Sequence, residues 1–266
     1  MPISIDGCVA QLIGDRKEQQ DRAELRQHPR QRKVVMAVVA DGMGGLTGGA
    51  LAAGQVVLTA MNSLAQFSPN DQTAGQLLTE ALNEAHAMIR TCRVLNEQDP
   101  NSTGVILMLR AQEDTMSATW AHCGDSRLYH FRGDQPVFHT RDHSYVEQMM
   151  QKGYLTPEQA AVHPNRNMLV TSLGGETPPL IDIGTAEDLR GGDSFLLCSD
   201  GLWAYFSDAE MAGVIAAFPA HEAAAKLIDQ ARQRANGRGD NCTAVVLKLE
   251  APPDPTTPTR PRPPTR

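Results

Sequence analysis

An apolar strand that runs directly into an aspartate and a glycine occurs twice in this sequence. The first instance is the segment VVADGMGG, from Val38 to Gly45, and the second is FLLCSDG, from Phe195 to Gly201. A carboxylate at the end of a strand projects from a rigid support, and the glycines let the backbone turn tightly and approach a ligand closely. Because Asp-Gly is also an ordinary turn dipeptide, one instance alone indicates only a turn. Two instances predict sheets whose ends carry Asp41 and Asp200.

Two further aspartates lie at turns next to predicted strands, Asp125 in GDSR and Asp240 in GDN, and Asp21 is a further candidate near the N-terminus. If these carboxylates converge with the first two, divalent cations must neutralise their mutual repulsion. Ligands that are all oxygen atoms select Mg²⁺ or Mn²⁺ rather than zinc. The adjacent His122 and Cys123 do not form a competing zinc site, because neighbouring residues of a strand point to opposite faces.

The pattern of apolar residues predicts an α+β chain with one folded domain over residues 1–250. Runs rich in β-branched residues indicate strands at Lys33–Ala40, Thr103–Arg110, Met116–His122, Arg127–Phe131, Ser194–Cys198 and Cys242–Leu249. Their close spacing favours antiparallel hairpins. Helical periodicity indicates helices, grouped in pairs, at Thr47–Gln66, Gln72–Leu95, Ser144–Lys152, Asp208–Ala217 and Pro219–Ala235.

Composition excludes several classes of function. The formal net charge of -7 argues against a sequence-independent grip on nucleic acid. Five scattered cysteines without a CxxC pair predict reduced residues in a cytoplasmic protein. The N-terminus lacks the pattern of a signal peptide, and the longest apolar region, residues 34–53, is interrupted by Asp41 and by glycines, so we expect no membrane span.

Residues 251–266 change abruptly to proline, threonine and arginine. A segment of this composition cannot build a core, and we expect it to be an extended, disordered tail. An alternative is a polyproline II ligand that a partner recognises.

Taken together and in this order, six segments resemble the type 2C family of metal-dependent protein serine/threonine phosphatases, in its bacterial branch. They are RKEQQD at residues 16–21, DGMGG at 41–45, GDSR at 124–127, DHS at 142–144, SDG at 199–201 and DN at 240–241. The resemblance covers about residues 7–249. It implies a β-sandwich of two antiparallel sheets flanked by pairs of antiparallel helices, in four α-β-β-α layers.

The resemblance also implies a site and a reaction. Two core Mn²⁺ or Mg²⁺ ions would be bridged by Asp41 and completed by the Gly42 carbonyl and by Asp21, Asp200 and Asp240. Asp125 would hold a third, weaker ion shared with Asp200. A hydroxide that bridges the two core cations would attack the phosphorus of phosphoserine or phosphothreonine in line.

Arg16 matches the arginine of the family's first motif. A planar guanidinium can bind two phosphate oxygens at once, so we expect Arg16 to hold the substrate phosphate. Many relatives place a histidine near the glycine turn as a general acid, whereas this chain has Met43 and Leu46 there. Either a metal-bound water or another histidine protonates the leaving oxygen. His163 lies in residues 147–175, which resemble a mobile flap, and is a candidate for substrate contact.

The expected partners are phosphoproteins and a cognate bacterial Ser/Thr kinase that the enzyme opposes in signalling. The motifs look most like phosphatases of that kind, including those linked to type VI secretion, and we expect a cytoplasmic monomer. Two alternatives compete. One is a catalytically inactive binding module, although such proteins usually lose metal ligands that are present here. The other is a nucleotide-binding protein, but residues 41–49 match neither GxxxxGK[ST] nor GxGxxG.

Overall fold

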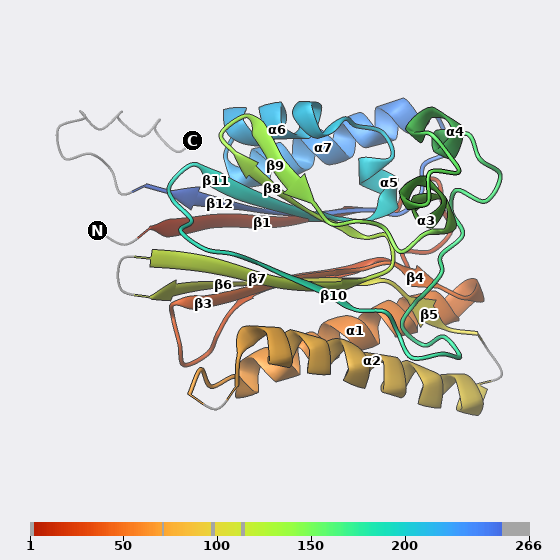
Figure 1. Ribbon diagram of the computed structural model, residues 1–266, viewed down its shortest axis with the longest axis horizontal. Coiled ribbons are helices and arrows are strands. Elements are labelled where there is room, and N and C mark those ends of the chain that lie inside the picture. Colours follow the sequence, from red (N-terminus) through yellow and green to blue (C-terminus); the bar gives the residue numbers. More distant parts are fainter. Residues whose placement is uncertain (1–2, 71, 97–98, 113–114, 252–266) are drawn as a thin grey trace, which may run out of the picture.

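Two five-stranded antiparallel sheets pack face to face in the computed structural model, which describes residues 3–70, 72–96, 99–112 and 115–251 (Figure 1). The strand orders are β1-β12-β11-β8-β9 and β10-β7-β6-β3-β2. The first sheet consists of β1 Ser4–Leu12, β12 Cys242–Glu250, β11 Asp193–Cys198, β8 Arg127–Arg132 and β9 Gln135–His139. The second consists of β10 Asp182–Ala186, β7 Thr115–Cys123, β6 Gly104–Gln112, β3 Val34–Ala40 and β2 Arg22–Gln27. A short third ladder pairs β4 Gly42–Met43 with β5 Asn101–Ser102.

Each sheet is covered on its outer face by a pair of long helices, which gives four layers (Figure 1). Helices α1 Gly45–Gln66 and α2 Ala74–Asn96 cover the sheet that contains β3, and α6 Asp208–Ala217 and α7 Ala220–Ala235 cover the sheet that contains β12. Three short helices, α3 Tyr145–Gln151, α4 Pro157–Ala161 and α5 Asp200–Trp203, lie together at one end of the sandwich (Figure 1).

The central strands read as continuous apolar runs because both of their faces are buried. In β3, Met36 and Val38 contact the α1/α2 layer, and the alternate residues Ala37 and Val39 fill the space between the sheets. Successive side chains of a strand point to opposite faces, so a single strand contributes to two cores. This double burial fixes the register of the strands, and the register in turn fixes the turns at their ends.

The structure confirms the predicted class, the sandwich and every predicted strand and helix to within a few residues. The prediction missed β1, β2, β4, β5, β9, β10 and the short helices α4 and α5. β1 was missed because its sequence, SIDGCVAQL, mixes glycine and polar residues with apolar ones; pairing with β12 over nine residues makes it a strand. The last strand, β12, ends at Glu250; the predicted domain boundary at residue 250 stays a prediction, because all but the first residue of the predicted tail, 251–266, lies outside the described residues.

Two further features concern the cysteines and the helices. All five cysteines are free thiols; Cys123, Cys198 and Cys242 are buried, whereas Cys8 and Cys92 are partly exposed. None of the helices in the described part of the chain combines the length and the apolar character that a membrane crossing needs.

Candidate metal centre

The five predicted aspartates meet at one end of the sandwich. Asp41 follows β3 and Asp21 precedes β2, and these ends coincide because Arg22 pairs with Ala40. In the other sheet Cys198 pairs with both Ala244 and Arg127, which places the end of β11 beside the starts of β12 and β8. The antiparallel register therefore brings together turns that are far apart in sequence, namely those of Asp21, Asp41, Asp125, Asp200 and Asp240.

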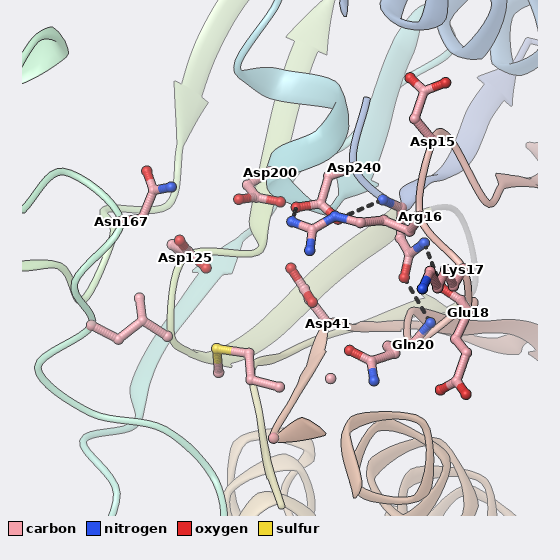
Figure 2. Close-up of a pocket in the computed structure, with 15 residues that line it drawn as sticks. Asp15, Arg16, Lys17, Glu18, Gln20, Asp41, Asp125, Asn167, Asp200 and Asp240 are labelled. Carbon is pink, nitrogen blue, oxygen red and sulfur yellow. Dashed lines mark hydrogen bonds and ion pairs between the residues drawn. The ribbon is translucent and has the colours of Figure 1, made fainter. Parts of the chain in front are cut away.

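Four of these carboxylates face a common space (Figure 2). Asp41, Asp125, Asp200 and Asp240 line a cleft of about 690 Å³, which Arg16, Gly42 and Asn167 also line. Asp21 lies behind the cleft wall and is fully buried. The structure thus brings together every residue that the sequence analysis assigned to the metal site, and it gives Asp21 the deepest position.

Burial and mutual repulsion make this cluster costly in the absence of a cation. Removal from water, followed by the charges of Asp21 and Asp200, raises the pKa of Asp41 well above its ordinary value. Burial and then the charge of Asp200 raise the pKa of Asp125 to about 8, and burial and then the charge of Asp240 raise the pKa of Asp200 to about 6. Carboxylates hold protons near neutral pH only when nothing else balances their charge, so the cluster fits bound cations.

Asp21 supplies a second indication of a cation site. Its Oδ2 accepts hydrogen bonds from the hydroxyls of Ser199 and Thr243, both at 2.7 Å, while its buried Oδ1 has no hydrogen-bond partner. An unsatisfied buried carboxylate oxygen is rare in folded proteins. The donor set is entirely oxygen, which suits Mn²⁺ or Mg²⁺. The residues present therefore fit a divalent centre.

The backbone at Asp41 is held by a neighbouring strand. The Asp41 N–H donates to the Thr103 hydroxyl at 2.9 Å, and the Asp41 carbonyl accepts from the Thr103 N–H at 2.9 Å. Gly42 is required at the next position, because a Cβ there would lie 2.0 Å from the Gly49 carbonyl oxygen. The strand-Asp-Gly pattern thus reflects close packing of the turn against α1 as well as the placing of a carboxylate.

The turn with Asp125 is also fixed on both sides. Gly124 has φ +101, a conformation that favours glycine, and its Cβ position is filled by Thr103. The Asp125 carbonyl accepts a hydrogen bond from the Trp203 indole N–H at 2.9 Å. The sequence analysis did not identify Trp203 as part of the site, because nothing local in the sequence links it to a turn 78 residues away.

Arg16 stands on a loop that is tied to the Asp240 turn. Asp15 exchanges two bonds with Gly239: the Asp15 N–H donates to the Gly239 carbonyl at 2.9 Å, and the Gly239 N–H donates to the Asp15 carboxylate at 2.7 Å. Asn241 donates from Nδ2 to the carbonyls of Ile13 and Glu18, at 2.8 and 2.9 Å. The guanidinium of Arg16 extends over the cleft and contacts the Asp240 carboxylate (Figure 2).

His163 stands apart from the cleft in the structure. It follows α4, its Nδ1 accepts the N–H of Asn165 at 3.1 Å, and its ring is 5.6 Å from the ring of Tyr145. It does not line the cleft, whereas Asn167, a few residues later in the same segment, does. A role for His163 in substrate contact stays a prediction.

A second group of candidate ligands, His122, His143 and Asp182, lies outside the cleft, with one ligand atom of each within 4.8 Å of the others. The two imidazole rings are stacked with an interplanar angle of 24°, so their nitrogen lone pairs point side by side rather than at one ion. His143 also accepts the Gly124 N–H at Nδ1, which leaves its proton on Nε2, facing Asp182 at 3.4 Å. His122 Nδ1 and His143 Nε2 are buried without a hydrogen-bond partner, and His122 Nε2 contacts the Arg141 carbonyl at 2.9 Å.

Comparisons with known proteins agree with this geometry. The family model for protein phosphatase 2C matches residues 12–238. The serine/threonine protein phosphatase PstP of Mycobacterium tuberculosis is 32% identical over 216 residues, which are 80% of this chain but only 40% of PstP, and a structure of its catalytic domain contains two manganese ions. A serine/threonine phosphatase of S. agalactiae is 26% identical with a TM-score of 0.83, covering 93% of this chain and 100% of that one. PppA, described as a regulatory component of type VI secretion in Pseudomonas aeruginosa, is 28% identical with a TM-score of 0.73, covering 93% and 99%.

Proposed function

This chain belongs to the protein phosphatase 2C family, and on that premise we propose that it hydrolyses phosphoserine and phosphothreonine on proteins. The observation that carries the proposal is the convergence of Asp41, Asp125, Asp200 and Asp240 on one open cleft beside an exposed arginine. Carboxylates of raised pKa in a cleft are typical of functional sites. The named relatives act as serine/threonine phosphatases, and the chain covers the whole of the S. agalactiae enzyme.

We assign the core cations to Asp21, Asp41, Asp200, Asp240 and the Gly42 carbonyl, and a third, weaker ion to Asp125 with Asp200. Bound there, Mn²⁺ or Mg²⁺ would supply an acidified water as the nucleophile and would balance the charge of the phosphoryl oxygens. The two manganese ions of the PstP catalytic domain support Mn²⁺ as the first metal to test.

The chain's own contribution is to orient the phosphate. Arg16 projects over the cleft from a loop that Asp15 and Asn241 fasten, so its guanidinium is held where a phosphate on the cations would meet it. Two parallel N–H donors fix both the position and the rotation of a phosphoryl group. In the absence of substrate the same guanidinium contacts Asp240, and a phosphate would take over that contact.

No histidine lines the cleft in the described part of the chain. Hence we propose that solvent in the open cleft, rather than an imidazole, supplies the proton to the leaving serine or threonine oxygen. We further propose a cytoplasmic monomer that opposes a bacterial Ser/Thr kinase. The similarity to PppA supports a place in the regulation of secretion.

Hydrolysis of p-nitrophenyl phosphate and of a phosphothreonine peptide tests the proposal. Both substrates should turn over with added Mn²⁺ and not in EDTA, and Asp200→Asn should abolish turnover while keeping the circular dichroism spectrum. Absence of turnover with Mn²⁺ and with Mg²⁺ would overturn the proposal. Calorimetric titration with Mn²⁺ separates an inactive binding module from an enzyme, because the module should lack a tight pair of sites.

A further inference from the structure

A second hollow continues from the cleft along the short helices. It has a volume of about 550 Å³ and is lined by residues of α3 and α4 and by residues of α5 and of the segment that follows it. Arg16, Asn167, Asp200 and Asp240 line both this hollow and the cleft, so the two hollows adjoin. We call the second hollow the flap groove.

Two of the four arginines that line the flap groove are already neutralised. Arg127 forms a double ion pair with Asp142, with distances of 2.7 and 2.8 Å, and Arg16 contacts Asp240. Arg166 and Arg238 are exposed, and within the described ranges no ion pair or side-chain hydrogen bond occupies their guanidinium groups. With cations on Asp200 and Asp240, these two arginines leave the outer part of the groove positive, offset only by Glu147.

The floor of the flap groove is apolar and firmly held. The Arg127 guanidinium lies 3.6 Å from the centre of the Trp203 ring, and the indole N–H is bound to the Asp125 carbonyl. Val146 and Met150 line the facing wall from α3. A groove with an apolar floor and unpaired cations at its edge suits an extended polypeptide whose acidic side chains reach the edge.

We propose that the flap groove binds the polypeptide next to the phosphorylated residue, and that Arg166 and Arg238 select substrates with acidic side chains there. The inference rests on the phosphatase activity proposed above and names its substrate class. Guanidinium groups pair with carboxylates through two parallel hydrogen bonds, and unpaired ones do so without first breaking an existing ion pair. Exposed pairs are weak, so each arginine should contribute about two- to fivefold to kcat/KM.

Three phosphothreonine peptides that differ only in their flanking residues test this inference with Mn²⁺ present. The flanks are glutamate, glutamine or lysine, and the readout is the ratio of kcat/KM between peptides, which cancels effects common to all substrates. The glutamate peptide should exceed the glutamine peptide by about four- to twentyfold at low salt. The advantage should shrink at high ionic strength, because exposed charges are screened.

Variants assign the preference to the two arginines. The double variant Arg166→Gln/Arg238→Gln should bring the glutamate-to-glutamine ratio close to one, and Arg238→Glu should move the preference toward the lysine peptide. The matched control is Arg190→Gln, an exposed arginine before β11 at the opposite end of the sandwich. Thermal unfolding verifies that each variant is folded.

The possible failures are distinguishable. Equal rates for the three peptides, or a glutamate preference that survives the double variant, would overturn the inference while the phosphatase activity stands. Absence of turnover for all peptides and for p-nitrophenyl phosphate would overturn the proposed function itself.

Discussion

His143 and Gly124 are joined by two hydrogen bonds: the His143 N–H donates to the Gly124 carbonyl at 2.9 Å, and the Gly124 N–H donates to His143 Nδ1 at 3.2 Å. The His143 carbonyl also accepts the N–H of Val170 at 2.9 Å. One residue therefore connects the segment around Val170 with the turn that carries Asp125. His143 is one of several links between the two, because Cys123 Sγ also contacts the Thr171 hydroxyl, at 3.8 Å.

This connection predicts different effects for two substitutions of His143. Asparagine places an acceptor oxygen at the position of Nδ1, so His143→Asn should retain the bond from Gly124, whereas His143→Leu leaves a buried N–H unsatisfied at a cost of about 1–3 kcal/mol. His143→Leu should lower the melting temperature and raise the Mn²⁺ concentration needed for half-maximal activity. Calorimetric Mn²⁺ titration checks that the tight sites persist. Equal behaviour of the two variants would contradict a role for the Nδ1 bond.

Asp41→Asn should stabilise the cation-free protein while it abolishes activity. The charges of Asp21 and Asp200 oppose ionisation of Asp41, and an amide of the same size removes that repulsion. We expect the free energy of unfolding to rise by about 1–2 kcal/mol, which is typical of substitutions that remove an unfavourable interaction from a functional site. Urea unfolding in EDTA at pH 8 measures this gain. With saturating Mn²⁺ the wild-type protein should be more stable than Asp41→Asn, because only the wild-type protein binds the cations tightly.

The control for this substitution is Asp229→Asn, which removes an exposed carboxylate from α7. It should change the free energy of unfolding by less than about 0.5 kcal/mol with or without Mn²⁺. A lower stability of Asp41→Asn than of the wild-type protein in EDTA would show that hydrogen bonding, and not repulsion, dominates at Asp41.

The same carboxylates predict how stability depends on pH when no cation is present. The folded-state pKa values of Asp200 and Asp125, about 6 and about 8, lie above the value of about 4 in an unfolded chain. The folded state therefore binds more protons than the unfolded state between about pH 4 and pH 8. The contribution of these two carboxyl groups to the free energy of unfolding is fully present below about pH 4. It is lost as pH rises to about 6 for Asp200 and to about 8 for Asp125.

Urea unfolding in EDTA from pH 5 to pH 9 measures this dependence, and comparison with Asp125→Asn isolates one carboxylate from the rest of the chain. The stability advantage of Asp125→Asn over the wild-type protein should grow from pH 5 to about pH 8 and level off above that pH. Saturating Mn²⁺ should stabilise the wild-type protein more at pH 8 than at pH 6, because protons compete with the cation. A difference between the two proteins that is independent of pH would refute the raised pKa of Asp125.

The sequence could predict those features that depend on neighbouring residues. Asp41 and Asp200 follow apolar strands, so the sequence of each short segment predicts that they lie at strand ends, and the continuous apolar run of β3 indicates a strand with two buried faces. The sequence could not predict contacts set by the register of distant strands. The bond from Trp203 to Asp125 and the pairing of β1 with β12 depend on which strands become neighbours, and a pattern of apolar residues does not specify this.

Asn241 gives the last prediction, because one side chain fastens both ends of the loop that carries Arg16. Its Nδ2 donates to the carbonyls of Ile13 and Glu18, and its Oδ1 accepts the N–H of Gln20 at 2.7 Å. Asn241→Asp replaces two donated bonds by repulsion between oxygen atoms while keeping the size of the side chain. We expect kcat/KM to fall by about 10- to 100-fold, which is the scale of losing a hydrogen bond between the displaced Arg16 guanidinium and the charged phosphate of the substrate.

A double-mutant cycle with Arg16→Ala determines whether Asn241 acts through the guanidinium. If it does, Asn241→Asp should cost little in kcat/KM once Arg16 is absent, and it should weaken inhibition by inorganic phosphate only while Arg16 is present. Additive losses would instead assign its effect to the neighbouring Asp240 and hence to the cations. Calorimetric Mn²⁺ titration of Asn241→Asp tells these two routes apart: an unchanged pair of tight sites with a raised KM would establish that the Asp240 turn positions the phosphate-binding arginine in addition to binding metal.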